Sequence, residues 1–320
     1  MDNLELFKFI GIQNEEDANK AMEVFCQEYS AITGTPPENV WDVLSLPEDI
    51  EEAVVIKDSP LISERSINII TVLKNLVKKW FSKEELPVAK RISRMISDNQ
   101  TDILPVGDFV RIAAHVYGNR EDAILANQWQ CLGNEYNGIR LDDSKSGLQA
   151  MLYKLDEGKI SRYVYAIAGT QNAKDWLTNL GQVIGISDQH DRAAEAAEKL
   201  AKELGTENLK MVGHSKGGGQ AAYCAMRTGC NAITFNPAGL GLYRYNLENW
   251  IEPRIDSFVM TTDPLNIFQL VAQLIAIDIT ADGSVHYVKP TSDMPVNIDT
   301  THGMNAFLHI LSTLLTNNDD

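Results

Sequence analysis

Gly213-His214-Ser215-Lys216-Gly217 is the stretch whose residue types and spacing best fit nucleophilic chemistry. A serine with a glycine two positions away on each side is typical of a nucleophile elbow, in which a strand turns sharply into a helix and exposes the serine hydroxyl. The glycines are required because side chains there would collide where strand and helix approach each other. About one chain in ten of this length would contain the pattern by accident, so the flanking sequence must decide between an elbow and an ordinary glycine-rich turn.

The sequence on either side of Ser215 favours the elbow. The preceding segment, NLKMVGHS, has the pattern of a short apolar strand, and the following segment, KGGGQAAYCAMRTG, that of a helix with a glycine-rich start. A phosphate-binding loop is the competing interpretation, but neither the P-loop spacing nor the G-x-G-x-x-G spacing is met. An elbow would place the Lys216 amide at a helix N-terminus, where it could stabilise an oxyanion.

A hydrolase elbow needs a general base, and the order along the chain is serine, acid, histidine. Three histidines follow Ser215. His286 lies in the alternating strand pattern SVHYV, and His309 lies among apolar residues of the helix pattern MNAFLHILSTLL, so we interpret both as structural. His302 lies in a polar loop before that helix and is followed by a glycine. An imidazole there can move and be reached, so we predict that His302 is the base.

The acid should lie just past the carboxyl end of a strand. Asp263 follows the apolar strand pattern IDSFVM. The same residue could cap a helix that begins near Leu265, with Pro264 in its first position, and one carboxylate can serve both purposes. Asp278 and Asp282 are weaker alternatives because no strong strand pattern precedes them. We predict that Asp263 is the acid.

Strands and helices alternate from about residue 105 onward, which predicts an α/β fold with a mostly parallel sheet. The patterns predict a helix over 106–118, a hairpin over 147–170, a helix over 188–205 and further strands over 208–214, 231–239 and 254–264. Reactive groups in such sheets collect at the carboxyl ends of the strands. Gly169 and Thr170 end the second strand of the hairpin, so Thr170 is the candidate second oxyanion donor, and an ordinary turn is the alternative.

The first part of the chain has a different character. Residues 1–104 are expected to form a helical N-terminal region, a cap or interaction segment, and 105–320 the catalytic domain. The segment 67–81 predicts a basic amphipathic helix. Such a helix more often packs on a neighbouring domain, and peripheral contact with a membrane or lipid surface is the alternative.

These motifs together resemble the class 3 lipase family of α/β-hydrolases, and the variant GHSKGG is similar to its bacterial lipase-like members. The resemblance covers roughly residues 105–315 and is carried by IAGT (167–170), DWLTNL (175–180), GHSKGG (213–218), TFNPAG (234–239), TTDPL (261–265) and THGM (301–304). It implies an α/β-hydrolase fold whose mostly parallel central sheet is flanked by helices. It also implies site roles for the following residues: nucleophile Ser215, acid Asp263, base His302, oxyanion hole Thr170 and Lys216, elbow glycines Gly213 and Gly217.

This sequence departs from the family pattern at two places. Ala168 stands where the family has an arginine, so the bracing of the oxyanion loop should differ. The segment after DWLTNL is short where lipases often carry a lid. Both departures favour the broader assignment, a hydrolase, over the narrower one, a true lipase.

Composition limits the partners and the compartment. The formal net charge of −16 argues against nucleic acid. No uninterrupted apolar run is long enough to span a membrane, and the first residues lack a signal-peptide pattern. The four cysteines have no metal-ligand spacing. We therefore expect a cytoplasmic protein, with export by a signal-less system as the alternative.

The expected activity is hydrolysis of a carboxylic ester, as by a lipase, phospholipase or esterase, through an acyl-enzyme and without metal or organic cofactor. The apolar segment 264–279 fits both an acyl pocket for a lipid or medium-chain ester and a core helix. Thioesterase, acyltransferase and peptidase activity on the same residues remain alternatives, as does a non-catalytic interaction protein on this scaffold.

Overall fold

The computed structural model describes residues 100–118, 125, 128–169, 188–240, 252–263, 265–266, 269, 281–294 and 301–317. Within them, a seven-stranded sheet has the order β1-β4-β5-β6-β7-β8-β9. Its strands are β1 (Trp129–Gly133), β4 (Ala150–Glu157), β5 (Ile160–Ile167), β6 (Leu209–His214), β7 (Asn231–Phe235), β8 (Ile255–Met260) and β9 (Ser284–Val288). A short separate hairpin is formed by β2 (Glu135–Tyr136) and β3 (Ile139–Arg140).

The sheet begins antiparallel and continues parallel. β1, β4 and β5 pair antiparallel, and each of the pairs from β5 to β9 is parallel. The β4–β5 hairpin turns at Gly158, whose φ of 66° suits a residue without a side chain. The carboxyl ends of β5, β6, β7 and β8 therefore meet at one edge of the sheet, which is where the predicted site residues should gather.

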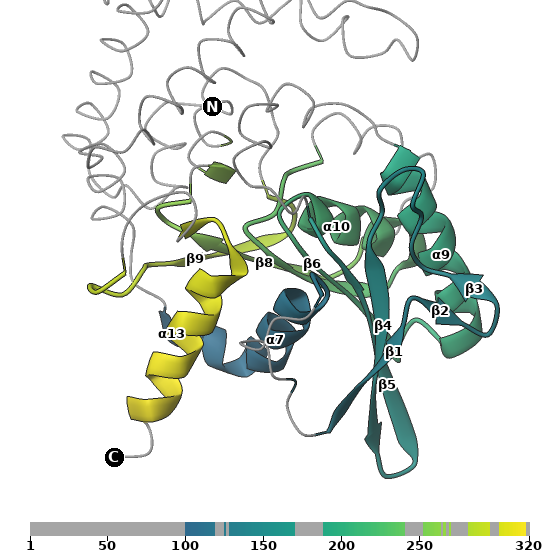
Figure 1. Ribbon diagram of the computed structural model, residues 1–320, viewed down its shortest axis with the longest axis horizontal. Helices are drawn as coiled ribbons and strands as arrows, with labels where there is room; N and C mark the ends of the chain where they lie inside the picture. Colours follow the sequence, from purple (N-terminus) through teal and green to yellow (C-terminus); the bar gives the residue numbers. More distant parts are fainter. Residues whose placement is uncertain are drawn as a thin grey trace, which may run out of the picture.

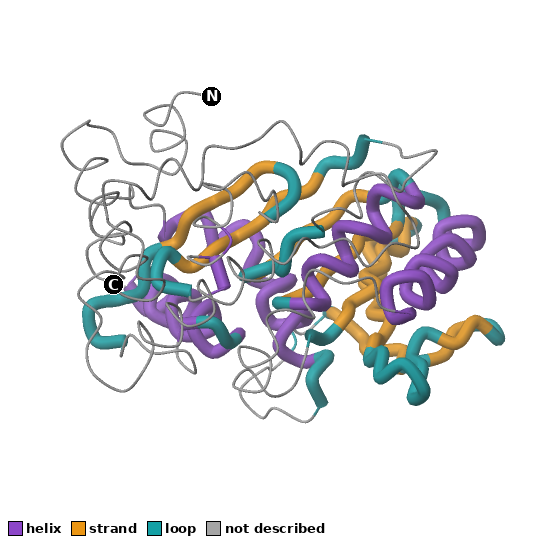
Figure 2. The backbone as a smooth tube through the Cα atoms, turned by 90° about the horizontal axis from the view of Figure 1, so that it is seen from above, coloured by secondary structure: helices purple, strands orange, loops and turns teal. Residues whose placement is uncertain are grey.

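Helices cover both faces of the sheet (Figures 1 and 2). The 3₁₀ helix η2 (Gln100–Val106), α7 (Gly107–His115) and α13 (Met304–Asn317) share one apolar core cluster with the sheet, and α9 (Asp188–Leu204) and α10 (Lys216–Thr228) share another. α10 ends at Gly229 in the left-handed conformation, with its amide bonded to Ala225 O. This arrangement is an α/β-hydrolase fold, as the sequence predicted.

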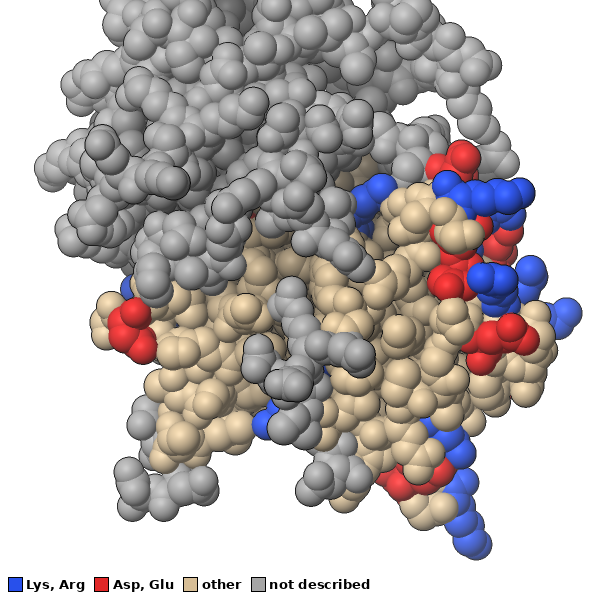
Figure 3. All heavy atoms as spheres, in the orientation of Figure 1, with Lys and Arg blue, Asp and Glu red and all other residues tan. Residues whose placement is uncertain are grey.

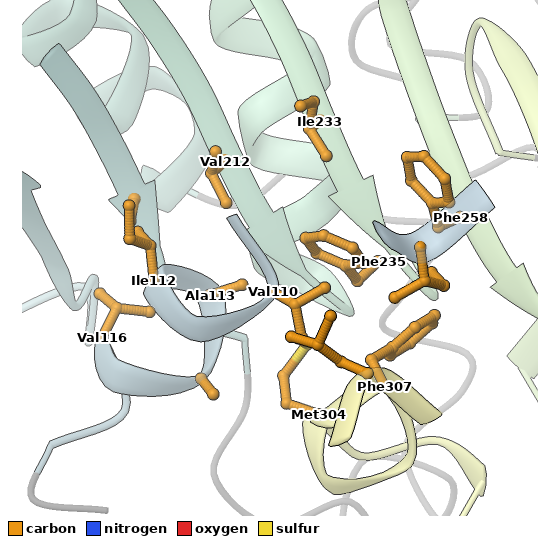
Figure 4. Close-up of a cluster of buried hydrophobic side chains, with 14 of the residues drawn as sticks. Val110, Ile112, Ala113, Val116, Val212, Ile233, Phe235, Phe258, Met304 and Phe307 are labelled. Carbon is orange, nitrogen blue, oxygen red and sulfur yellow. The ribbon is translucent and has the colours of Figure 1, made fainter. Parts of the chain in front are cut away.

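Alternate residues of each strand face opposite core clusters. In β6, Val212 faces α7 and α13, whereas Met211 faces α9 and α10. On the first face, Phe235 stacks on Phe258 and meets Phe307 of α13 edge-on (Figure 4). Because His214 is two residues beyond Val212, its side chain lies on the same face as α7. His214 can therefore contact residues at the end of α7.

The domain division expected at 104/105 falls inside η2, whose Ile103 is fully buried in the first core cluster. Residues before 100 are outside the described part of the chain, so the helical N-terminal region, including the amphipathic segment 67–81, stays a prediction. The described charges on the face shown in Figure 3 gather over α9 and at the tip of the β4–β5 hairpin. Within the described residues, no helix combines the length and apolar character needed to cross a membrane.

Candidate active site

Ser215 occupies a sharp turn between β6 and α10. Its φ of 57° and ψ of −128° are rare for a residue with a side chain and indicate a strained backbone. A Cβ on Gly213 would lie 2.1 Å from Gly217 O, and a Cβ on Gly217 would lie 2.3 Å from Ile167 O. The two glycines are therefore required by close backbone approach.

Backbone hydrogen bonds hold this turn in place. The Ser215 amide donates to Phe235 O at the end of β7 over 3.0 Å. The Ser215 carbonyl accepts the amides of Gly218, Gly219 and Ala238 over 2.9, 3.2 and 2.9 Å. The strain at Ser215 is thus balanced by contacts from both the helix and the neighbouring strand.

The structure brings Ser215, His302 and Asp263 together in one hydrogen-bonded series. His302 Nε2 lies 2.9 Å from Ser215 Oγ, and His302 Nδ1 lies 2.7 Å from Asp263 Oδ1. A carboxylate can only accept, so Nδ1 carries the proton and Nε2 is the acceptor for the serine hydroxyl. This is the tautomer that a general base needs.

Asp263 is fully buried just past the end of β8. Besides His302, its Oδ1 accepts the Leu265 amide over 3.3 Å and its Oδ2 accepts the Asn266 amide over 3.1 Å. Both contacts that the sequence suggested for this residue, to the histidine and to following backbone amides, are therefore present at once. These three hydrogen bonds hold the buried carboxyl group in one orientation.

The alternative acids and histidines lie elsewhere. Asp282 precedes β9, at the edge of the sheet opposite the elbow, and accepts the Leu240 amide; Asp278 lies outside the described residues. His286 is in β9, bonded to Asp256 Oδ1 over 3.2 Å, and its ring stacks on Phe258, in line with its structural interpretation.

Two expectations about the histidines were wrong. His309 does not pack among apolar residues: its side chain is 43% exposed and pairs with Asp293 Oδ2 over 3.1 Å. α13 is amphipathic, and His309 lies on its solvent-facing side. His302 does not lie in an open loop: it is 3% exposed, with Asn236 past β7 bonded to its carbonyl and Asp263 past β8 bonded to its ring.

The oxyanion-hole candidates are described in part. The Lys216 amide lies in the first turn of α10, where amides have no acceptor within the helix. Thr170 lies outside the described residues, so its predicted contribution stays a prediction. Its neighbour Gly169 lies within the described residues and packs closely against the elbow. A Cβ on Gly169 would lie 2.6 Å from His214 O and 3.0 Å from Ser215 Cβ. The end of β5 therefore contacts the elbow directly.

The Lys216 side chain is half-buried at the start of α10, one residue past Ser215. Burial lowers the pKa of its ammonium group below the usual value. The positive end of the α10 dipole also lies here, and it favours a negative charge at this helix N-terminus.

Three polar residues of the site escaped the sequence analysis: Tyr117, His214 and Asn236. Tyr117 Oη lies 2.6 Å from His214 Nδ1, and His214 Nε2 lies 2.7 Å from His302 O. Asn236 Nδ2 donates to the carbonyls of both Thr301 and His302. The available signals were the histidine inside the elbow motif and the asparagine that follows the β7 pattern, but nothing in the sequence names their partners. Among the described residues, no group of three or more metal-ligating side chains occurs.

Part of the chain is similar to known proteins. Residues 110–250 match a phospholipase-like family described as a Tle-like phospholipase domain. The matched segment contains the elbow and ends before Asp263 and His302. Over 115 residues, 36% of this chain, the sequence is 43% identical to a protein of Serratia liquefaciens named extracellular phospholipase A1. That alignment spans about a third of the relative's own length, 35%.

Solved structures show a looser likeness. A Rhizomucor miehei lipase propeptide complex is 14% identical with a TM-score of 0.43, over 65% of this chain and 76% of that one. A CIB-like hydrolase from Thermoplasma acidophilum is 16% identical with a TM-score of 0.35, over 59% and 98%. We draw nothing about function from scores this low. Over the segment that carries the elbow, the chain is similar to phospholipase-like proteins.

Proposed function

We propose that this protein is a serine carboxylic-ester hydrolase that acts on phospholipids. The observation that carries the proposal is the series Ser215 Oγ, His302 Nε2, His302 Nδ1 and Asp263 Oδ1, with separations of 2.9 and 2.7 Å, on a strained elbow. The phospholipase-like match over the elbow and the relative named phospholipase A1 support a phospholipid ester as the substrate. A place among the bacterial class 3 lipase-like proteins is the finer form of the same proposal, supported by the GHSKGG motif.

The reaction begins with attack on the ester carbonyl. His302 Nε2 takes the proton of Ser215 as Oγ bonds to the carbonyl carbon, and Asp263 stabilises the imidazolium that forms. The carbonyl oxygen becomes an oxyanion, which the Lys216 amide and a second donor from the loop after β5 stabilise. Each such donor contributes about 3 kcal/mol to transition-state stabilisation.

The intermediate then collapses and the enzyme is restored. The carbon–oxygen bond to the leaving alcohol breaks, and His302 donates its proton to that oxygen. The remaining acyl group is held as an ester on Ser215. Water attacks this ester with His302 again as the base, and the acid is released. For a phospholipase A1, the leaving alcohol is a lysophospholipid.

A serine-directed probe tests the chemistry. We expect a fluorophosphonate to label the wild-type protein on Ser215, and Ser215→Ala to abolish both labelling and turnover of p-nitrophenyl butyrate. The matched control is Ser257→Ala, a buried serine of β8 whose hydroxyl bonds Thr234 and Asp282 O, outside the site. Turnover that persists in Ser215→Ala would sink the proposal.

A substrate panel tests the phospholipid assignment. Phosphatidylcholine and phosphatidylglycerol vesicles, triacylglycerol emulsions, p-nitrophenyl esters of rising chain length, an acyl thioester and an amide should be compared by kcat/KM. We expect release of fatty acid and lysophospholipid from the vesicles. A preference for the thioester or the amide would contradict the ester assignment, and a preference for triacylglycerol would contradict the phospholipid.

The compartment is a separate part of the proposal. The relative from Serratia is named as extracellular, whereas the expectation for this chain is cytoplasmic. Fractionation of producing cells, followed by blotting of culture supernatant and cytosol, distinguishes retention from export.

A further inference from the structure

His214 belongs to a chain of hydrogen bonds in which every donor and acceptor has a fixed direction. The carbonyl of His302 can only accept, so His214 Nε2 donates to it over 2.7 Å. An imidazole with its one proton on Nε2 accepts at Nδ1, and Tyr117 then donates its hydroxyl proton there over 2.6 Å. The Tyr117 oxygen in turn accepts the Gly169 amide over 2.8 Å. The series runs one way, from Gly169 through Tyr117 and His214 to His302.

This chain joins the elements that carry the site. Gly169 is at the end of β5, Tyr117 follows α7, His214 ends β6 immediately before Ser215, and His302 precedes α13. The Tyr117 and His214 rings meet edge-on at 5.7 Å, and the His214 and His302 rings lie 5.0 Å apart. His214 is 5% exposed, so its bonds are sheltered from competing water.

The backbone of His302 is held from a second side. Asn236, at the end of β7, donates to the carbonyls of Thr301 and His302 over 3.0 and 2.8 Å. Its own Oδ1 accepts the Met260 amide over 2.8 Å, which ties it to the end of β8, three residues before Asp263. The carbonyl of His302 therefore accepts from two residues, His214 in the elbow and Asn236 at the end of the neighbouring strand. These bonds leave the imidazole little freedom to move relative to Ser215.

We propose that Tyr117 and His214 are positioning residues: their hydrogen-bond chain sets His302 against Ser215 and holds Gly169, just past the end of β5, against the elbow. The inference rests on the proposed serine hydrolase mechanism. Neither residue touches the reacting atoms; His214 acts through the His302 backbone and Tyr117 acts through His214 and Gly169. Such placement matters because misplacing a catalytic group by about 1 Å can cost about a hundredfold in rate.

The first test removes the phenol hydroxyl with Tyr117→Phe. We expect kcat for p-nitrophenyl butyrate to fall about tenfold or more while KM changes by less than about twofold, because substrate contacts are untouched. The matched control is Tyr165→Phe, which removes a buried hydroxyl bonded to Leu141 O on the opposite face of the sheet. Equal kcat values for the two variants would overturn the inference.

A second test separates positioning from simple packing at His214. His214→Gln keeps an amide donor near the place of Nε2, whereas His214→Leu keeps the volume and removes the donor. We expect His214→Gln to retain at least about fivefold more kcat than His214→Leu. Indistinguishable kcat values for the two would overturn the inference. These two His214 variants also test the inference if Tyr117→Phe fails to fold.

A spectroscopic readout does not depend on turnover. The proton shared by His302 Nδ1 and Asp263 should give a downfield resonance in the wild type that disappears in His302→Gln. We expect this resonance to broaden or shift in Tyr117→Phe and to stay unchanged in Tyr165→Phe. A wild type that shows the resonance without esterase activity would refute the proposed function only. An unchanged resonance in Tyr117→Phe would refute the positioning inference only.

Discussion

Ser215 Oγ lies 2.9 Å from His302 Nε2 although the two residues are 87 positions apart in the chain. Ser215 is placed by a strand-to-helix turn, and His302 is placed by carbonyl contacts to His214 and Asn236. The distance therefore depends on the carboxyl ends of β6, β7 and β8 meeting at one edge of the sheet. Substitutions that do not disturb these strand ends should leave the distance between Ser215 Oγ and His302 Nε2 unchanged.

Replacing His302 by alanine should lower kcat for p-nitrophenyl butyrate by about 10⁴-fold or more, because His302 is the base that contacts the serine hydroxyl among the described residues. His309→Ala is the control, since that imidazole pairs with exposed Asp293 on the solvent side of α13. It should keep nearly full activity. Steady-state kinetics at saturating substrate measure both. The assignment fails if His302→Ala retains more than about a tenth of wild-type kcat.

Replacing Asp263 by asparagine should lower kcat by about 10⁴-fold, because an amide can donate to Nδ1 and so favour the wrong tautomer of His302. A loss of stability should accompany it, since the carboxylate also accepts the Leu265 and Asn266 amides. The control is Asp293→Asn, whose partner His309 is far from the elbow. Urea denaturation separates unfolding from loss of catalysis. Asp263→Asn with near wild-type kcat would show that the acid lies elsewhere.

The sequence predicts much of the fold because its signals here are local. The hairpin pattern in 147–170 and helical periodicity in 188–205 place the β4–β5 hairpin and α9, and the strand–Gly-x-Ser-x-Gly–helix pattern places the elbow. Chain order then selects Asp263 and His302 as candidates, and the structure brings both to Ser215. Their catalytic roles stay a prediction until the variants are measured.

The features that the sequence did not predict are contacts and exposures that depend on long-range packing. Tyr117 and His214 are 97 positions apart, and no local pattern indicates that α7 ends beside β6. The exposure of His309 depends on which face of α13 covers the sheet, and a largely apolar helix pattern leaves that open. The surroundings of His302 likewise depend on residues at three separate strand ends, since its backbone and ring bond His214, Asn236 and Asp263.

Replacing Gly213 by alanine should prevent the native elbow from forming. Its Cβ would lie 2.1 Å from a backbone oxygen that α10 holds in place, so neither atom can give way cheaply. Gly107→Ala is the contrast, because its Cβ would meet only the flexible end of Leu311 at 3.0 Å. We expect Gly213→Ala to lose several kcal/mol of stability, about 3 or more, and Gly107→Ala to lose about 1 or less. Thermal unfolding followed by circular dichroism checks both, and equal melting temperatures would contradict the close approach.

Replacing Lys216 by methionine should stabilise the fold near neutral pH while keeping the backbone amide. Burial lowers the pKa of the lysine in the folded state below its unfolded value near 10.5. The unfolded chain therefore binds more protons between the two pKa values, and the lysine destabilises the fold fully below the folded pKa. The stability difference between Lys216→Met and wild type should accordingly be largest at neutral pH and shrink as the pH rises toward 10.5.

The same variant separates the two parts of Lys216 in the proposed reaction. The backbone amide, the oxyanion donor, is retained in Lys216→Met, so turnover of the neutral ester p-nitrophenyl butyrate should stay close to wild type. The ammonium group is lost, so kcat/KM for phosphatidylglycerol relative to phosphatidylcholine should fall if the Lys216 side chain contacts an anionic headgroup. Urea titrations from neutral to alkaline pH and vesicle assays measure the two effects. An unchanged headgroup preference together with a pH-independent stability difference would show that the Lys216 side chain is merely solvated.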